Sequence, residues 1–417
     1  MKTQKVFALI FLTSLVLWAQ EPTIVESGKY YIFTWSTSAE AKTIPSQLTM
    51  NHLNGDVLIR GYHNNIIKYV EKMQIEAPSQ REAEKLWERY HLKFESDENG
   101  FIVNNEGKKN LTFGSRSIRV DYIVDVPEMT SVAVNTLGGN IDVSALQGAT
   151  ELVSAGGNIR IENSRGRIFT KTYGGDVQAY QLEGKVDVRS AGGDIEMRLV
   201  TGEISVETAG GDILLKTVNG NLDATTLGGD IELSGANGQK IRLKTMGGDI
   251  QVDECEADLY AETKGGEIKF RNLIGSVEGK TSGGNVYCRN IDGPARLSTM
   301  GGDVEIIRIS GTVDAETRNG SILISKYFSS KFENHKIFAS TQNGSINLDL
   351  PANADVTFDL TARGYDNTIS SEFDIDIKKI DSRHPRHNRA TGLAGKGTHT
   401  VELYVDNGNI KIRKRGQ

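Results

Sequence analysis

Acidic and amide side chains recur at an almost constant spacing through the middle of this 417-residue chain. Five aspartates follow one another at steps of eighteen or nineteen residues: Asp176, Asp194, Asp212, Asp230 and Asp249. The series also includes Asn140, Asn158, Glu267, Asn285 and Asp303. If successive members stack, neighbouring carboxylates repel one another, and calcium, which takes oxygen ligands, would offset that cost. A calcium ladder is therefore one interpretation of the series.

A structural role is the other interpretation. Calcium-binding β-rolls use a nine-residue motif in which a second glycine and an aspartate follow a Gly-Gly pair. Here each step brings one carboxylate, and asparagines interrupt the series. Asp and Asn also accept hydrogen bonds from backbone N–H groups at tight turns. We favour this second role, predict no metal site, and keep the calcium ladder as the alternative.

Catalytic signatures are missing from the sequence. It has neither a Gly-x-Ser-x-Gly nucleophile motif nor a phosphate-binding loop, so we predict no catalytic residue, no cofactor and no enzyme. Asp187, Asp223 and Asp314 share one repeat position, as a sugar-cleaving solenoid enzyme would need, but Phe169, Ser205, Arg242 and Tyr260 interrupt them. His384 and His387 lie among arginines, which indicates a solvated basic loop rather than a metal site.

The element that would position these side chains is a repeat marked by Gly-Gly pairs. Ten pairs begin eighteen residues apart, with a single step of nineteen: Gly138, Gly156, Gly174, Gly192, Gly210, Gly228, Gly247, Gly265, Gly283 and Gly301. Counting the first glycine as position one, positions four and six are apolar, as in Ile231 and Leu233, and position five is mostly polar. That alternation is typical of a strand with one buried face.

Two further positions support one coil per repeat. Position eleven is nearly always glycine and predicts a second corner, after which apolar residues alternate again. Position seventeen is a series of Ser and Thr, whose hydroxyls suit parallel strands stacked coil on coil. A hairpin meander gives no reason for like residues to recur at every coil. The sequence therefore predicts an all-β, single-stack parallel β-solenoid of about ten coils, roughly 48 Å long at ~4.8 Å per coil.

The flanks divide the chain into four predicted parts. Residues 1–20 read as a signal peptide, 21–130 as a β-rich cap, 131–324 as the repeats and 325–417 as a β-rich C-terminal region and cap. In the first cap, Asn54-Gly55-Asp56-Val57 echoes the repeat, and Ser79 with Glu82 predicts the start of one short helix. In the second, Tyr327 to Phe338 reads as an insertion, and Asn407-Gly408-Asn409-Ile410 as a last repeat-type strand.

Composition narrows the function further. The apolar run after Lys2 and Lys5 predicts export, with an uncleaved N-terminal anchor as the alternative, and no later segment is apolar enough to cross a membrane. A net charge of −6 without a basic stripe excludes a nucleic-acid partner. Cys255 and Cys288 fall two coils apart, roughly 9.6 Å, beyond disulfide reach, so we expect two buried free thiols.

The Gly-Gly-Asp-Ile-x-Val repeats, together with Val124-Asp125-Val126-Pro127, resemble the bacterial putative adhesin family over roughly Asn51 to Arg413. That resemblance implies a secreted or envelope-facing β-solenoid and transfers no catalytic residue. We therefore expect an exported, non-enzymatic binding or scaffolding surface in the cell envelope, with a glycan or an envelope protein as partner. The alternatives are a self-assembling structural protein and a carbohydrate-active enzyme.

Overall fold

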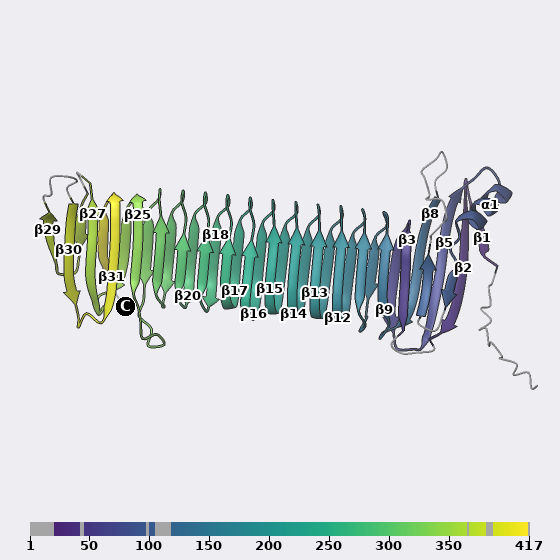
Figure 1. Ribbon diagram of the computed structural model, residues 1–417, viewed down its shortest axis with the longest axis horizontal. Coiled ribbons are helices and arrows are strands. Elements are labelled where there is room, and N and C mark those ends of the chain that lie inside the picture. Colours follow the sequence, from purple (N-terminus) through teal and green to yellow (C-terminus); the bar gives the residue numbers. More distant parts are fainter. Residues whose placement is uncertain are drawn as a thin grey trace, which may run out of the picture.

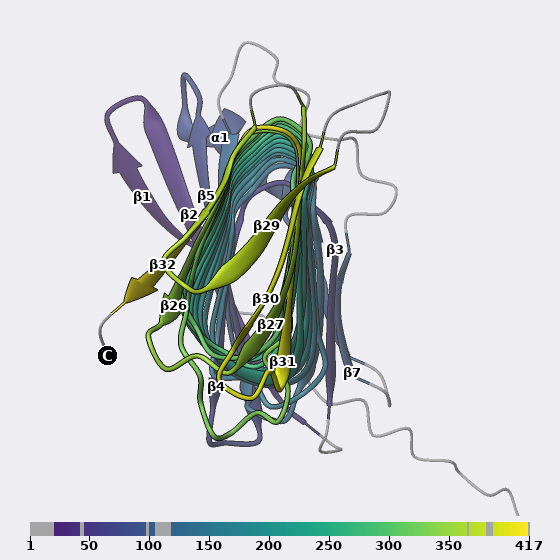
Figure 2. The ribbon, with the colours of Figure 1, turned by 90° about the vertical axis from the view of Figure 1, so that its left-hand side faces the viewer.

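The computed structural model describes residues 21–41, 46–96, 100–104, 118–364, 367–380 and 387–415. It is a long stack of parallel β-coils with a different cap at each end (Figure 1). Seen along the stack, each coil is a flattened loop whose two long sides are strands, so the stack presents two facing sheets (Figure 2). The predicted signal peptide, residues 1–20, lies outside the described residues.

The central coils confirm the predicted parallel solenoid. Ile195 pairs with Ile213 and Ile213 with Ile231, so equivalent residues of successive coils lie directly over one another. The strands are β12 Ile159–Thr172, β13 Val177–Ser190, β14 Ile195–Thr208, β15 Ile213–Thr226, β16 Ile231–Lys244 and β17 Ile250–Glu262. We call the sheet that contains positions four to six the first sheet, and the one that contains positions thirteen to seventeen the second sheet.

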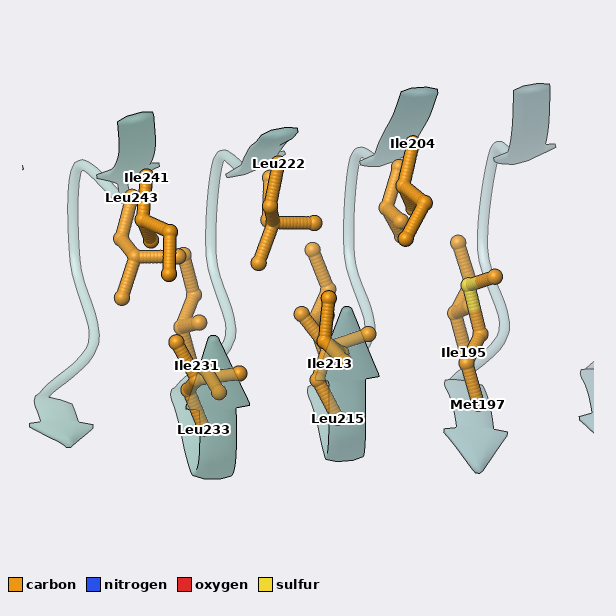
Figure 3. Close-up of a cluster of buried hydrophobic side chains, with 14 of the residues drawn as sticks. Ile195, Met197, Ile204, Ile213, Leu215, Leu222, Ile231, Leu233, Ile241 and Leu243 are labelled. Carbon is orange, nitrogen blue, oxygen red and sulfur yellow. The ribbon is translucent and has the colours of Figure 1, made fainter. Parts of the chain in front are cut away.

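Aliphatic columns fill the space between the two sheets. Side chains such as Ile213 and Leu215 of the first sheet point towards Leu222 of the second, coil after coil (Figure 3). Ile231 is 1% exposed, whereas Glu232 beside it is exposed, which confirms the predicted inward and outward assignment. Burial of these columns supplies the hydrophobic stabilisation of a fold that has few aromatic residues.

The second glycine of each Gly-Gly pair is required by close approach of the backbone. A Cβ on Gly193 would lie 2.2 Å from the carbonyl oxygen of Gly175 in the coil below, and a Cβ on Gly211 would lie 2.3 Å from that of Gly193. A Cβ on the first glycine, Gly192, would meet nothing nearer than 3.8 Å. Close approach of the backbone therefore requires the second glycine of a pair but not the first, a distinction that the sequence repeat alone does not reveal.

The second corner combines two left-handed residues, of which the sequence indicated one. Position-eleven glycines such as Gly184 and Gly202 have φ of +128°, as predicted. Position eight is also left-handed, although glycine fills it in one repeat alone, at Gly235. Leu199 and Thr217 take the same conformation with φ of 57° and 56°, at a cost in backbone energy that the stack must offset.

Each strand of the central coils continues through the second corner without a break. The sequence predicted two strands per repeat, but β12 to β16 each run for 14 residues across both sheets. The extra residue of the single nineteen-residue repeat also lies at the second corner. The pairing of β15 with β16 shifts register between Asn219 and Leu222, so the extra residue forms an irregularity at the corner and leaves the core columns aligned.

At the N-terminal end, spatial order departs from chain order. The elements are β1 Thr23–Ser27, β2 Tyr30–Glu40, β3 Gln47–Leu53, β4 Asp56–Tyr62, β5 Ile66–Glu76, α1 Gln80–Tyr90, β6 Phe94–Ser96, β7 Gly100–Asn104, β8 Ile118–Pro127, β9 Ser131–Thr136, β10 Ile141–Ser144 and β11 Thr150–Ser154. β3 and β4 form a coil beneath β9 and β10, and Val57 pairs with Ile141, which confirms the predicted echo of the repeat. Beyond β8, the first sheet continues through antiparallel β5, β2 and β1.

The predicted short helix is α1, which lies over the outer strands of this cap. Ser79 occupies the N-cap position as expected, although its side chain makes no capping hydrogen bond. Ala83 is buried, and Trp87 stacks on Phe33 of β2 with ring centroids 5.8 Å apart. The helix thereby covers apolar surface that an open solenoid end would expose.

The last coils of the solenoid lead into the C-terminal cap, where spatial order again departs from chain order. Its elements are β18 Ile268–Ile274, β19 Val277–Lys280, β20 Val286–Asp292, β21 Ala295–Ser298, β22 Val304–Ile309, β23 Val313–Thr317, β24 Ile322–Lys326, β25 Ile337–Asn343, β26 Ile346–Pro351, β27 Val356–Arg363, β28 Ile369–Ser371, β29 Ile375–Ile380, β30 His387–Ala394, β31 His399–Asn407 and β32 Ile410–Arg415. Ile410 pairs with Ile346, which confirms the predicted repeat-type strand. β31 and β32 are last in the chain but not in the stack, because β27 and β28 pair on their far side.

Candidate functional site

The acidic series forms hydrogen-bonded rungs between coils. The Oδ1 atom of Asp176 accepts a bond of 2.9 Å from the backbone N–H of Asp194, and Oδ1 of Asp194 accepts one of 2.8 Å from Asp212. Asparagine serves equally well, since Oδ1 of Asn158 accepts from the N–H of Asp176. The backbone donor offsets the repulsion between stacked carboxylates and explains why Asp and Asn interchange.

The candidate calcium ladder of Asp176, Asp194, Asp212, Asp230 and Asp249 thus has a structural partner at every step. The series changes at Glu267, whose Oε1 accepts a bond from the side-chain amide of Asn285. Within the described ranges, no group of three His, Cys, Asp or Glu side chains is placed to hold a metal ion. The thermal midpoint with calcium and with a chelator would test the remaining calcium hypothesis.

The hydroxyl series forms a second set of rungs beside the first. Thr208 Oγ1 donates to the carbonyl oxygen of Gly193 in the coil below, and the N–H of Gly211 donates to Thr208 Oγ1 at 3.4 Å. The equivalent hydroxyl-to-carbonyl bonds from Ser154 to Thr317 measure 2.8–3.0 Å. Each hydroxyl from Ser154 to Thr299 also accepts a bond from the N–H of a following glycine, so these buried polar groups are satisfied by the repeat itself.

The three aspartates that share one repeat position, Asp187, Asp223 and Asp314, each form an ion pair. On the outer surface of the second sheet, Asp187 pairs with Arg189 at 2.9 Å, Asp223 with Arg242 at 3.7 Å, and Asp314 with Arg296 at 3.4 Å. They lie in different coils, each beside its own arginine. The described residues therefore do not bring these three carboxylates together as an acid–base pair for sugar cleavage would require.

The remaining reactive side chains are buried or only partly described. Cys255 and Cys288 are buried and free, as predicted, and burial raises the pKa of the Cys255 thiol to about 12 and that of Cys288 further. A thiol with so high a pKa is a poor nucleophile at neutral pH. His384 lies outside the described residues, and of His387 the structure describes the backbone at the start of β30.

A concave site lies where the predicted insertion meets the C-terminal cap. Residues 327–336 leave the stack after β24 and return at β25, forming the loop that projects from the stack near its C-terminal end (Figure 1). The insertion is two residues shorter than predicted, because Ile337 and Phe338 already belong to β25. An open pocket lies between this loop and the segments around Pro351 and His399, and we call it the loop pocket.

Two buried basic groups fasten the loop to the stack. Lys326, 4% exposed, donates from Nζ to the carbonyl oxygens of Ser310, at 2.7 Å, and Gly311. His335, 3% exposed, places Nδ1 2.7 Å from the same Ser310 oxygen and Nε2 3.1 Å from that of Ser329. Burial lowers the pKa of Lys326 to about 7, and burial together with the nearby Lys326 lowers that of His335.

Sequence reasoning located the insertion but missed the loop pocket. The signal available was the break in period after Asn319-Gly320, together with Phe328, Phe332 and His335 inside a segment that the repeat does not need. What the sequence could not supply was the second wall, because His399 is distant in the chain and reaches the loop through the reordered C-terminal strands.

One of three comparisons with known proteins identifies the family. Residues 71–264, 178–291 and 240–413 match the family described as Toastrack DUF4097, a domain of unknown function. A search of curated proteins finds no match. Among the described residues, no helix has the length and apolar character needed to cross a membrane.

Two solved structures are similar over most of the chain, at low identity. One is a putative cell adhesion protein from Clostridium sporogenes ATCC 15579, at 10% identity, covering 92% of this chain and 99% of that one, with a TM-score of 0.16. The other is a putative adhesin from Bacteroides fragilis NCTC 9343, at 13% identity, covering 91% and 96%, with a TM-score of 0.17. Scores this low do not establish a shared fold. The family match spans most of the solenoid and both flanks, and on that ground the chain belongs to the Toastrack DUF4097 family.

Proposed function

We propose that this protein is an exported, non-enzymatic binding or scaffolding surface of the bacterial cell envelope, with an adhesin-like role. The predicted signal sequence and the resemblance of the repeats to the putative adhesin family support this assignment. The partner would be a glycan or an envelope protein, and the solenoid would act by presenting many coils at once to an extended ligand.

The observation that carries the proposal is the outer surface of the second sheet. Half-buried aromatic rings lie beside charged groups on this surface: Arg189 lies over the ring of Phe169, and Lys244 and Lys280 each lie 5.5 Å from the ring centroid of Tyr260. Aromatic rings with a polar surround are enriched where proteins bind other molecules. The two rings lie five coils apart on the same surface, so an extended ligand could contact both.

The experiment combines fractionation with binding. Antibody detection in cell fractions should place the protein outside the cytoplasm, and the purified protein should retain defined glycans on an array or a defined envelope component on a column. A reducing-sugar assay on any bound glycan should show no release. Recovery from the cytoplasm, or failure to retain any glycan or envelope component, would contradict the proposal, and sugar release would favour the enzyme.

One observation favours self-assembly as the second candidate. Among the described residues, β1 pairs only with β2 and β29 only with β30, so an open strand edge remains at each end. Val25 on β1 is 58% exposed and Ile377 on β29 is 44% exposed. Open edges with exposed apolar side chains are templates for pairing with another chain. Electron microscopy and light scattering distinguish the two, since filaments favour assembly and dispersed monomers favour binding.

A further inference from the structure

The loop pocket has an apolar wall made of stacked rings. Phe328 lies parallel to His399 with ring centroids 5.7 Å apart, and both meet His335 edge to face at 4.9 Å. Phe332 adds a further ring to the lining. Tyr327, 38% exposed, stands at the entrance. A pocket of this kind offers flat apolar surface to a ligand of matching shape.

Several polar side chains around this wall have no partner among the residues that the structure describes. Ser330, Glu333, Asn353 and the ring nitrogens of His399 make no hydrogen bond or ion pair with the residues that the structure describes. The acidic and hydroxyl rungs of the coils differ in this respect, because their polar atoms bond the neighbouring coil. These pocket side chains therefore keep their full hydrogen-bonding capacity, whereas each rung aspartate already uses Oδ1 on the neighbouring coil.

The set of free groups indicates the chemistry of the ligand. The pocket lining contains neither Lys nor Arg, and it contains the carboxylates Glu333 and Asp355, so it does not suit a phosphate or a carboxylate ligand. Asn353 and Ser330 both donate and accept, Glu333 accepts, and His399 does either according to tautomer. Sugar hydroxyls also donate and accept, and a sugar ring has an apolar face that packs on aromatic rings.

The pocket is held in shape before any ligand arrives. Lys326 and His335 fix both ends of the loop to the corner at Ser310, and Asp355 on the opposite wall accepts bonds of 3.1 and 2.8 Å from the N–H and hydroxyl of Thr398. A site fixed by buried contacts loses little freedom when it binds. Beyond the pocket, Phe338 and Tyr404 lie 5.9 Å apart on the outer surface of β25 and β31, where a longer glycan could continue.

We propose that the loop pocket binds one sugar ring of an uncharged glycan, with the ring face against the aromatic wall and its hydroxyls bonded to Asn353, Glu333 and His399. This inference rests on the proposed binding function and adds to it a ligand class and a place. The outer surface of the second sheet would then extend contact with the same chain of sugars.

The test measures glycan binding by the purified full chain and by variants of the pocket rim. A glycan array identifies the best uncharged glycan, and calorimetry then gives its dissociation constant for the wild type, Asn353→Ala and Glu333→Gln. Both substitutions remove exposed polar groups without a protein partner, so the variants should fold normally, which circular dichroism checks. Glu232→Gln is the matched control, since Glu232 is exposed on β16 in the first sheet, away from both the pocket lining and the outer surface of the second sheet.

We expect each rim variant to weaken binding about tenfold or more, the usual loss when a ligand hydroxyl is left unpaired, and the control to bind as the wild type does. Binding that survives both substitutions would overturn the pocket while leaving the general binding function intact. Binding of a defined envelope protein without any glycan would overturn the sugar assignment. Failure to bind anything would count against the proposed function itself.

Discussion

Replacing Gly193 by alanine adds one methyl group where the backbones of two coils approach closely. The new Cβ would lie 2.2 Å from the carbonyl oxygen of Gly175 and 2.5 Å from Oδ1 of Asp176. Carbon atoms in ordinary contact sit about 3.5–4.0 Å from their neighbours, so the two coils would have to separate by about 1 Å or more at this corner. The nearest atom is a backbone oxygen, which cannot rotate away as the Asp176 side chain could.

The cost follows from the hydrogen bonds that such a separation stretches. The N–H of Gly193 bonds Ser190 Oγ at 3.0 Å, Ser190 Oγ bonds the Gly175 oxygen at 2.9 Å, and the N–H of Asp194 bonds Asp176 Oδ1 at 2.9 Å. At about 1 kcal/mol for each bond, the loss is about 3 kcal/mol before any strain is added. Gly192→Ala provides the matched control, because its Cβ would meet nothing nearer than 3.8 Å.

Urea unfolding followed by circular dichroism should show a loss of about 3 kcal/mol for Gly193→Ala and a change within about 1 kcal/mol for Gly192→Ala. Native-state hydrogen exchange should locate the damage in the coils that meet at this corner, since each coil contacts only its neighbours. Equal effects of the two substitutions, large or small, would refute the idea that close approach is what requires the second glycine.

The core, the corner, the buried lysine and the acidic rungs give four further predictions. Ile231→Asp should cost several kcal/mol by burying an unpaired charge and Glu232→Lys less than about 1 kcal/mol; similar losses in urea unfolding would contradict the inward and outward assignment. Thr217→Gly should stabilise the protein by about 1 kcal/mol because it relieves a left-handed β-branched residue, whereas Gly235→Ala should destabilise it by a similar amount; the opposite signs would refute this. Between pH 7 and 10.5, Lys326 is protonated in the unfolded chain and neutral in the folded chain. The free energy of unfolding should therefore rise with pH across that window by at most about 5 kcal/mol, and Lys326→Met should flatten the rise. An unchanged pH profile in the variant would show that another group is responsible. The thermal midpoint should be the same with calcium and with a chelator, and a higher midpoint with calcium would restore the metal ladder.

The middle of this fold can be predicted from sequence because every coil faces a copy of itself. A residue such as Ile213 pairs with Ile195 on one side and Ile231 on the other, so one pattern of inward and outward residues, repeated, specifies strand, register and stacking together. The rungs follow for the same reason: an Asp or Thr at a fixed place in each coil meets the same backbone group in the next.

The left-handed conformation at position eight and the order of the C-terminal strands were not predicted, because neither is determined by the type of residue at those positions. Position eight is left-handed in every repeat from Ala145 to Arg308, yet Leu199, Thr217 and Arg308 have no preference for that conformation. The tight corner and the hydrogen bonds between coils impose it. At the ends, insertion of β31 and β32 beneath β27 and β28 joins segments that share no repeat spacing, so the loop pocket between residue 328 and residue 399 has no signature in the local sequence.

The same physics separates what holds this molecule together from what it can recognise. Groups that obey the repeat, such as Asp194 and Thr208, use their hydrogen-bonding atoms on the neighbouring coil, and a group so engaged has less to offer a ligand. Groups that break the repeat, such as Glu333 and Asn353, keep that capacity. Specific recognition should therefore reside in the insertion and at the caps, while the regular coils set the length of the surface on which a long partner lies.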